Sequence, residues 1–193
     1  MNDKTKKTLI IVGSVSALCI LACVALFIVG NSMFKRVGKM FQTDPAKVAQ
    51  AAHTIVDYDL PPGYSERMSM DFISYRVAMI GPTDENSSML IMLGQFTSST
   101  LNPDQMAEQI RKAFEQQGAQ PGLSMRTVET RTMTIRGTQT DVTIREGTSS
   151  AGFTFRQLIT VFPGKGGPAV LMIQGTTADW DEKLVDAFIQ SIR

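Results

Sequence analysis

An uncharged apolar run of 23 residues, TLIIVGSVSALCILACVALFIVG, occupies residues 8–30 and constrains this chain more than any other feature. As an α-helix it would span about 34 Å, enough to cross the hydrocarbon core of a bilayer. A cleaved secretory signal has a shorter apolar core, followed by a small-residue cleavage site that is missing here. The run therefore predicts a retained transmembrane helix, between a short basic tail at residues 1–7 and a juxtamembrane linker at residues 31–43.

Two further interpretations of this run stay open. The stretch Ile20–Cys23, ILAC, loosely resembles a lipoprotein box in which the cysteine is acylated, although the run stays apolar beyond it. Cys19 and Cys23, or the small residues Gly13 and Ala17, could also bring two such helices together as a homodimer. The chain has only these two cysteines, so the rest of it has neither a disulfide nor a cysteine metal site.

Charge is distributed unevenly along the chain. Residues 1–43 hold six basic side chains and one acidic one, so of the totals of 19 and 18, residues 44–193 hold 13 basic and 17 acidic. Such a mildly acidic domain does not favour nucleic acid as a partner. The short basic tail favours a cytoplasmic N-terminus. We therefore expect a single-pass protein of the cell membrane that contacts the lipid bilayer through residues 8–30 and places residues 44–193 outside the cytoplasm.

Residues 44–193 show the pattern of one α+β domain with an antiparallel sheet. A helix is expected after Asp44, an N-cap followed by proline at the first helical position, and it ends at LPPGY. Two more helices are expected over 101–118 and 179–193, where apolar residues recur at helical spacing. SMLIMLGQF is apolar on both faces and predicts a central, covered strand. The expected strands are 64–81, 88–96, 124–135, 138–147, 153–162 and 169–176.

The glycine-rich stretch FPGKGGPAV, residues 162–170, raises the possibility of a phosphate-binding loop. A loop of the Walker type needs Ser or Thr after its lysine and a helix after the loop. Here Gly166 follows Lys165, and the next segment has the pattern of a strand. The stretch therefore predicts a hairpin with Lys165 at its solvated tip.

Motifs for catalysis are missing from this sequence. His53 is the only histidine, and no G-x-S-x-G, H-E-x-x-H or EF-hand pattern is present. The two carboxylates of DYD, residues 57–59, are expected to lie in a solvated loop. We therefore expect a noncatalytic protein with no catalytic residues and no cofactor.

Two groups of residues are candidates for binding. The chain has 12 methionines, and Met68 and Met70 share a strand face. Thioethers are ligands of Cu(I), but methionine also fills irregular cores. Prolines and aromatic residues around LPPGY could form a surface for a protein partner, or could pack as a helix-to-strand connection. The residues of this candidate surface are Tyr58, Pro61, Pro62, Tyr64 and Trp180.

The order of elements over roughly residues 57–193 resembles the Mog1/PsbP-like α-β-α sandwich. Its most specific part is GGPAVLMIQGTTADWDEKLVDAFIQSI, a last strand running into a tryptophan-bearing helix. The chain also looks like single-pass, membrane-anchored bacterial envelope proteins. The resemblance implies fold better than function. It implies a noncatalytic accessory or protein-binding module of the cell envelope, with an envelope protein as partner; the alternative is an extracytoplasmic domain that binds a small ligand or Cu(I).

Overall fold

The computed structural model describes residues 41–72, 75–84, 87–96, 105–106, 108–109, 112, 123–149 and 152–193. The expected transmembrane helix 8–30 lies outside these residues. Within the described ranges, no helix has the length and apolar character needed to cross a membrane. Most of the expected helix 101–118 is also outside them, and the five residues of it that are described are helical.

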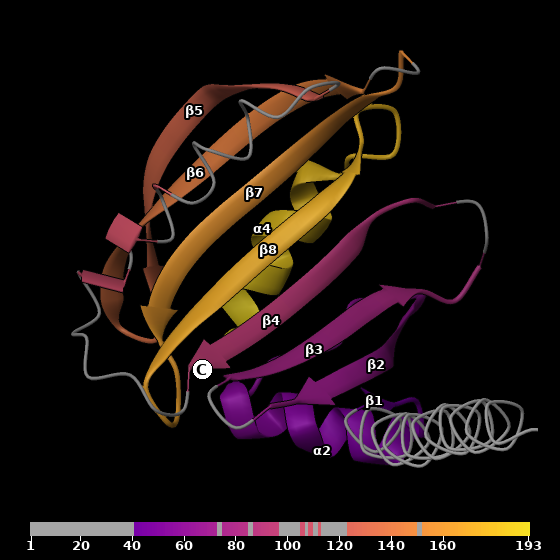
Figure 1. The fold of residues 1–193 in the computed structure, drawn as a ribbon, viewed down its shortest axis with the longest axis vertical. Coiled ribbons are helices and arrows are strands. Elements are labelled where there is room, and N and C mark those ends of the chain that lie inside the picture. The colour runs from indigo at the N-terminus through magenta and orange to yellow at the C-terminus, as the bar shows by residue number, and fades with distance from the viewer. Residues whose placement is uncertain are drawn as a thin grey trace, which may run out of the picture. The chain divides into compact units, whose positions relative to one another are not determined.

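One eight-stranded antiparallel sheet forms the centre of the unit Phe41–Arg193, as Figure 1 shows. Its order is β1-β2-β3-β4-β8-β7-β6-β5, so β4 pairs with the last strand rather than with the next one. The expected α+β class with an antiparallel sheet is confirmed. The strands are β1 (Phe41–Gln42), β2 (Tyr64–Asp71), β3 (Tyr75–Pro82), β4 (Leu90–Phe96), β5 (Leu123–Ile135), β6 (Thr138–Ser149), β7 (Thr154–Pro163) and β8 (Pro168–Thr176).

The expected strand 64–81 is in fact two strands, β2 and β3, which pair with each other. The backbone N–H of Phe72 donates to the carbonyl of Tyr75 at 2.9 Å where the chain reverses. Neither glycine nor proline marks this reversal in the sequence, which is why the pattern predicts a continuous strand. SMLIMLGQF forms β4, which lies between β3 and β8 and is central as expected.

Two helices begin at aspartate N-caps. In α2 (Pro45–Ile55), Asp44 Oδ1 accepts a hydrogen bond from the N–H of Ala46 at 3.1 Å. In α4 (Glu182–Ser191), Asp181 Oδ1 accepts from the N–H groups of Lys183 and Leu184 at 2.9 and 3.1 Å. Helix α4 is shorter than the expected 179–193 at both ends, because Asp181 caps its start so that Glu182 is its first residue, and it ends at Ser191.

The core lies between these helices and one face of the sheet. Apolar side chains of α2 and α4, among them Ile55 and Phe188, form one buried cluster with alternate residues of β3, β4 and β8. Since side chains alternate across a strand, the intervening residues of the same strands point to the opposite face. The sheet residues of the core cluster are Tyr64, Ala78, Ile80, Ile91, Leu93, Ile135, Val142, Ile144, Leu158, Phe162, Ala169, Leu171 and Ile173.

Candidate binding groove

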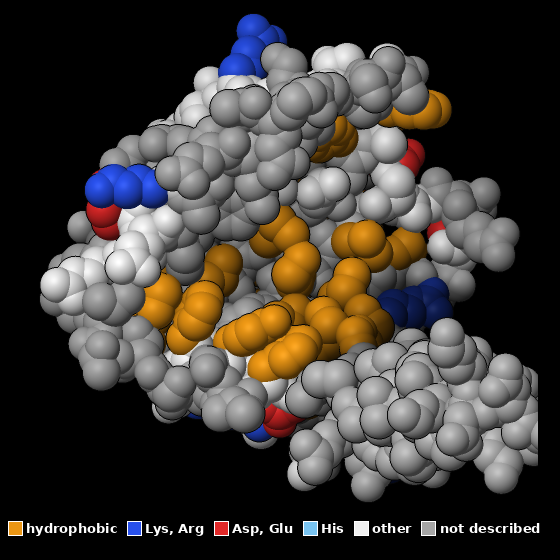
Figure 2. Space-filling model, in the orientation of Figure 1, with side chains coloured by type: hydrophobic (Ala, Val, Ile, Leu, Met, Phe, Trp, Pro, Cys, Tyr) orange, Lys and Arg blue, Asp and Glu red, His pale blue; other side chains and the backbone are white. Residues whose placement is uncertain are grey.

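The sheet face opposite α2 and α4 carries an apolar groove over β3, β4 and β8. Val77, Gly94 and Val170 lie directly opposite one another in the register of these three strands. Their neighbours Ala78 and Leu93 belong to the core on the other face. We call the side on which Val77 and Val170 lie the groove face. Figure 2 shows hydrophobic side chains gathered over a hollowed part of the molecule seen from this side.

The groove has a volume of about 300 Å³. Its aromatic end is built by Tyr75 and Phe96, whose rings are 6.4 Å apart, and by Phe72, which stacks on Tyr75 at 4.4 Å. Gly94 contributes no side chain between Met92 and Phe96, so the floor of the groove is low there. The side chains that line it are Tyr75, Val77, Met92, Phe96, Val170 and Met172.

Polar groups contribute little to the groove. Among the described lining residues only Arg76 is charged, and its guanidinium lies on the other face of the sheet. There its Nη2 is 2.6 Å from Asp71 Oδ2, and it donates to the Thr54 hydroxyl at the end of α2. The Gln95 amide also lies away from the groove and donates to the Gly167 carbonyl at 3.4 Å. The described lining of the groove is therefore suited to an apolar group.

Three of the five residues in the sequence-predicted partner surface are buried. Tyr58 and Tyr64 are 4% and 9% exposed, and Pro61 is buried as well. The Tyr58 ring lies 5.5 Å from that of Phe188 in the core. These positions agree with a packed helix-to-strand connection. Pro62 is exposed and Trp180 is half-buried, and the use of either by a partner stays a prediction.

The environment of Tyr58 also alters its ionisation. Burial raises the pKa of its phenol well above the ordinary value, and the neighbouring Glu66 carboxylate raises that pKa further. The Tyr58 hydroxyl donates to Glu66 Oε1 at 3.2 Å. A phenol held neutral in this way supports the packing of the connection and is unsuited to act as a base.

Both carboxylates of the DYD stretch form ion pairs. Asp57 Oδ1 lies 2.6 Å from Lys165 Nζ and 3.4 Å from His53 Nδ1. Asp59 Oδ1 lies 2.8 Å from Arg193 Nη2. The hydrogen bonds from Lys165 and Arg193 hold the pKa values of Asp57 and Asp59 below the ordinary range. The expectation of a solvated loop is right about exposure but misses these contacts.

The loop around Lys165 is a hairpin between β7 and β8, as expected. Gly164 donates through its N–H to the Gly167 carbonyl at 2.8 Å. Lys165 is not the solvated tip that the sequence predicts, because its Nζ donates to the His53 carbonyl at 2.9 Å as well as to Asp57. A strand follows this loop instead of a helix, so it lacks the helix N-terminus that binds phosphate in Walker-type loops.

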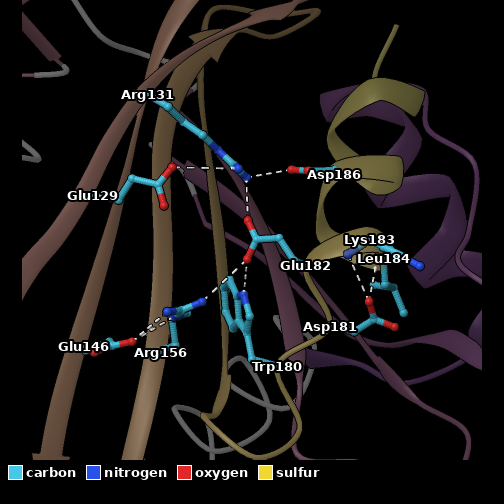
Figure 3. Close-up of polar contacts among 10 residues, drawn as sticks. All are labelled: Glu129, Arg131, Glu146, Arg156, Trp180, Asp181, Glu182, Lys183, Leu184 and Asp186. Carbon is cyan, nitrogen blue, oxygen red and sulfur yellow. Dashed lines mark hydrogen bonds and ion pairs between the residues drawn. The ribbon is translucent and has the colours of Figure 1, made fainter.

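A second polar cluster attaches α4 to the sheet, as Figure 3 shows. Glu182, at the start of α4, accepts from Trp180 Nε1 at 2.7 Å and lies 2.9 Å from Arg131 Nη2. Arg131 also lies 2.6 Å from Asp186, and Arg156 lies 2.7 Å from Glu146. These groups are paired with one another and contain no nucleophile, so we interpret the cluster as structural.

The thioethers proposed from the sequence lie on the groove face. Met68 pairs with Met79, and Met70 pairs with Val77, so both point to the same side as the groove. Both are half-buried. In the part of the chain that the structure describes, no group of three or more His, Cys, Asp or Glu residues could hold a metal ion.

Sequence reasoning missed the groove itself. Its one local signal is Gly94, because an isolated glycine inside a strand pattern indicates a close approach to the backbone or an unfilled position. The contribution of Val170 and Met172 follows only from the pairing of β4 with β8, which the sequence pattern does not predict.

No protein-family model matches the sequence, and no curated protein matches it. Several solved structures are similar to it. The cyanobacterial PsbP protein of Synechocystis has a TM-score of 0.42 and 8% identity, with 72% of this chain and 92% of that one covered. LpqN, a protein involved in cell envelope biogenesis of Mycobacterium tuberculosis, has a TM-score of 0.37 and 13% identity, with 68% and 76% covered.

The immunity protein TplEi of the type VI secretion system of Pseudomonas aeruginosa has a TM-score of 0.42 and 12% identity. It covers 88% of this chain, which spans only 59% of the immunity protein. At these scores and identities, the three similarities concern the arrangement of helices and strands. No family and no function are transferred from these proteins to this chain.

Proposed function

We propose that this chain is a noncatalytic binding module that receives an apolar segment of a partner protein in its groove. The observation that carries the proposal is the groove itself, about 300 Å³ in volume and lined by aliphatic, aromatic and thioether side chains. Apolar patches on a protein surface commonly mark sites of association. The described polar clusters around Asp57 and Glu182 form ion pairs that attach α2 and α4 to their surroundings, which further supports a binding role over a catalytic one.

The position of the groove favours a protein over a small molecule. A site for a small apolar ligand usually encloses most of the ligand's surface. The groove instead lies on the face of the sheet away from the core that α2 and α4 cover. Its volume suits one or two apolar side chains of a partner, with Tyr75 and Phe96 providing rigid aromatic contacts at one end.

We further propose that residues 8–30 anchor the chain in the cell membrane and that the domain lies outside the cytoplasm, where an envelope protein would be its partner. The support for this is the length and apolarity of the run and the basic tail before it. A reporter that is active only in the cytoplasm, fused after Arg193, should be inactive. An active fusion would overturn this topology.

The groove is tested by filling it. A Cβ at position 94 would meet only Arg76 O at 3.9 Å and Val170 Cβ at 4.0 Å, so Gly94→Ala should be tolerated. The longer side chain of Gly94→Leu should occupy the groove. In the parent protein, full-length and in its native membrane, a photoreactive residue at position 77 should crosslink one defined protein. The additional change Gly94→Leu should abolish this crosslink, and Gly94→Ala should leave it in place.

A photoreactive residue at exposed Lys183 is the matched control and should not give this crosslink. The proposal is wrong if the crosslinks at the two positions are the same, or if Gly94→Leu leaves the crosslink at position 77 unchanged. Native mass spectrometry of the full-length protein tests the alternative, which is a small apolar ligand in the groove. A bound non-protein mass that is lost in Gly94→Leu would replace the protein partner with a small apolar ligand.

A further inference from the structure

Four methionines form an unbroken row across the groove face. Met68, Met79, Met92 and Met172 occupy directly opposing positions on β2, β3, β4 and β8. Opposing residues of antiparallel strands place their side chains on the same face, with Cα atoms about 4.5–5.5 Å apart. All four side chains are half-buried. The row therefore brings four thioether sulfurs from four adjacent strands to one line on the sheet.

We propose that Met68, Met79 and Met92 form a binding site for Cu(I). Thioethers are soft ligands that select Cu(I) over the harder divalent ions. Methionine side chains are unbranched and flexible, so sulfurs from neighbouring strands can converge on one ion. This proposal goes beyond partner binding in the groove, and the two sites share Met92.

A β-bulge creates the register of this row. The pairing shifts between Glu66, which lies opposite Ile80, and Met68, which lies opposite Met79. Arg67 is the extra residue of the bulge. In a regular ladder without the bulge, Arg67 would lie opposite Met79, in the position that Met68 occupies. The bulge thus puts Met68 opposite Met79, while the Arg67 side chain lies beside Gly81 on the same face and donates to the Pro82 carbonyl.

The neighbours of the row suggest which sulfurs hold the ion. Met172 Sδ accepts a hydrogen bond from Gln157 Nε2 at 3.2 Å, which directs it toward β7 and away from β4. Met70 lies diagonal to Met79 on the same face, because its own pairing partner is Val77. Three consecutive thioethers therefore form the site, and Met70 is placed to supply a fourth.

The charge of the site points to a monovalent ion. The three ligands are neutral, so nothing in the set compensates the higher charge of a divalent cation on a half-buried, apolar face. Carboxylate or imidazole ligands, which zinc and calcium would need, are absent from the row. We therefore expect binding of Cu(I) and of its redox-inert analogue Ag⁺, and no binding of Zn²⁺ at this site.

The test uses the full-length protein in detergent with Cys19→Ser and Cys23→Ser, because thiolates would otherwise bind the same ions. Ag⁺ is titrated first, and Cu(I) under ascorbate second. Met79→Leu keeps side-chain volume but removes the central ligand. We expect one ion per chain with the parent protein, and binding at least about tenfold weaker with Met79→Leu.

Met89→Leu is the matched control, because Met89 is buried in the core on the opposite face. It should bind Ag⁺ like the parent. NMR of methionine methyl groups in the parent protein gives a second measurement that needs no substitution, and the resonances of Met68, Met79 and Met92 should shift with Ag⁺. The proposal fails if no ion binds, if Met79→Leu binds as the parent does, or if Met89→Leu weakens binding equally.

Discussion

Lys165 Nζ lies 2.6 Å from Asp57 Oδ1, although 108 residues separate them in the chain. The same ammonium group donates to the His53 carbonyl, and the Lys165 N–H donates to the Ile55 carbonyl at 2.8 Å. The last carbonyls of a helix have no partners within the helix. The β7–β8 loop thus satisfies the C-terminal end of α2, so the lysine of this glycine-rich loop has a structural role.

Replacing the lysine tests that role. In Lys165→Met the ion pair and the hydrogen bond to the His53 carbonyl are lost, and we expect the melting temperature to fall by a few degrees at most, because ion pairs exposed to solvent contribute little. Lys183→Met, at an exposed position of α4, should leave it unchanged. If inorganic phosphate stabilised the native protein but not Lys165→Met, the loop would be an anion site after all.

The same loop depends on the absence of a side chain at position 164. A Cβ on Gly164 would lie 2.9 Å from both Ala169 Cβ and the Gly167 carbonyl oxygen, closer than real contacts allow. We expect Gly164→Ala to lower the free energy of unfolding by about 1–3 kcal/mol. Gly94→Ala, with no atom nearer than 3.9 Å, serves as the control. Equal stability of the two variants in urea would contradict this geometry.

Acid should destabilise the domain through three aspartates. Hydrogen bonds from Lys165, Arg193 and Ser88 lower the pKa values of Asp57, Asp59 and Asp179 below the ordinary value of 3.8. A carboxyl whose folded pKa is lowered stabilises the fold above the unfolded pKa, and this stabilisation is lost as the pH falls through the folded pKa. Denaturant midpoints should therefore be steady above about pH 5 and decline below about pH 4.

Lys165→Met separates one of these contributions. Without the ammonium group, the pKa of Asp57 returns toward its ordinary value, so the variant should lose less stability than the native protein over the same acid range. An unchanged acid dependence would show that Asp57 is not linked to folding in this way.

The attachment of α4 should depend on Glu182. Glu182→Gln removes the charge that pairs with Arg131 and weakens the acceptor of the Trp180 indole N–H. We expect a loss of about 1 kcal/mol, measured by urea unfolding followed through Trp180 fluorescence. Glu129→Gln is the control, because its carboxylate lies 3.9 Å from Arg131 and makes the longest contact of that arginine. A larger effect in the control would shift the anchoring role to β5.

Local features of the sequence were sufficient for several elements of the domain. Asp44 followed by Pro45 marked the start of α2, because an N-cap side chain and a fixed proline φ act within one helical turn. The alternation of polar and apolar residues marked β6, and FPGKGGPAV marked the hairpin between β7 and β8. The apolar run at residues 8–30 predicts a membrane anchor for the same local reason, and that prediction awaits its test.

Only the tertiary structure decided which surfaces these elements form. The pairing of β4 with β8 brings Gly94 beside Val170, and the bulge at Arg67 brings Met68 opposite Met79. Tyr58 and Tyr64 looked like surface aromatics beside prolines, but packing against the core buries them. Composition and spacing encode what a short segment can form by itself. Strand order, register and burial depend on contacts between distant segments, and the groove and the methionine row exist only because of those contacts.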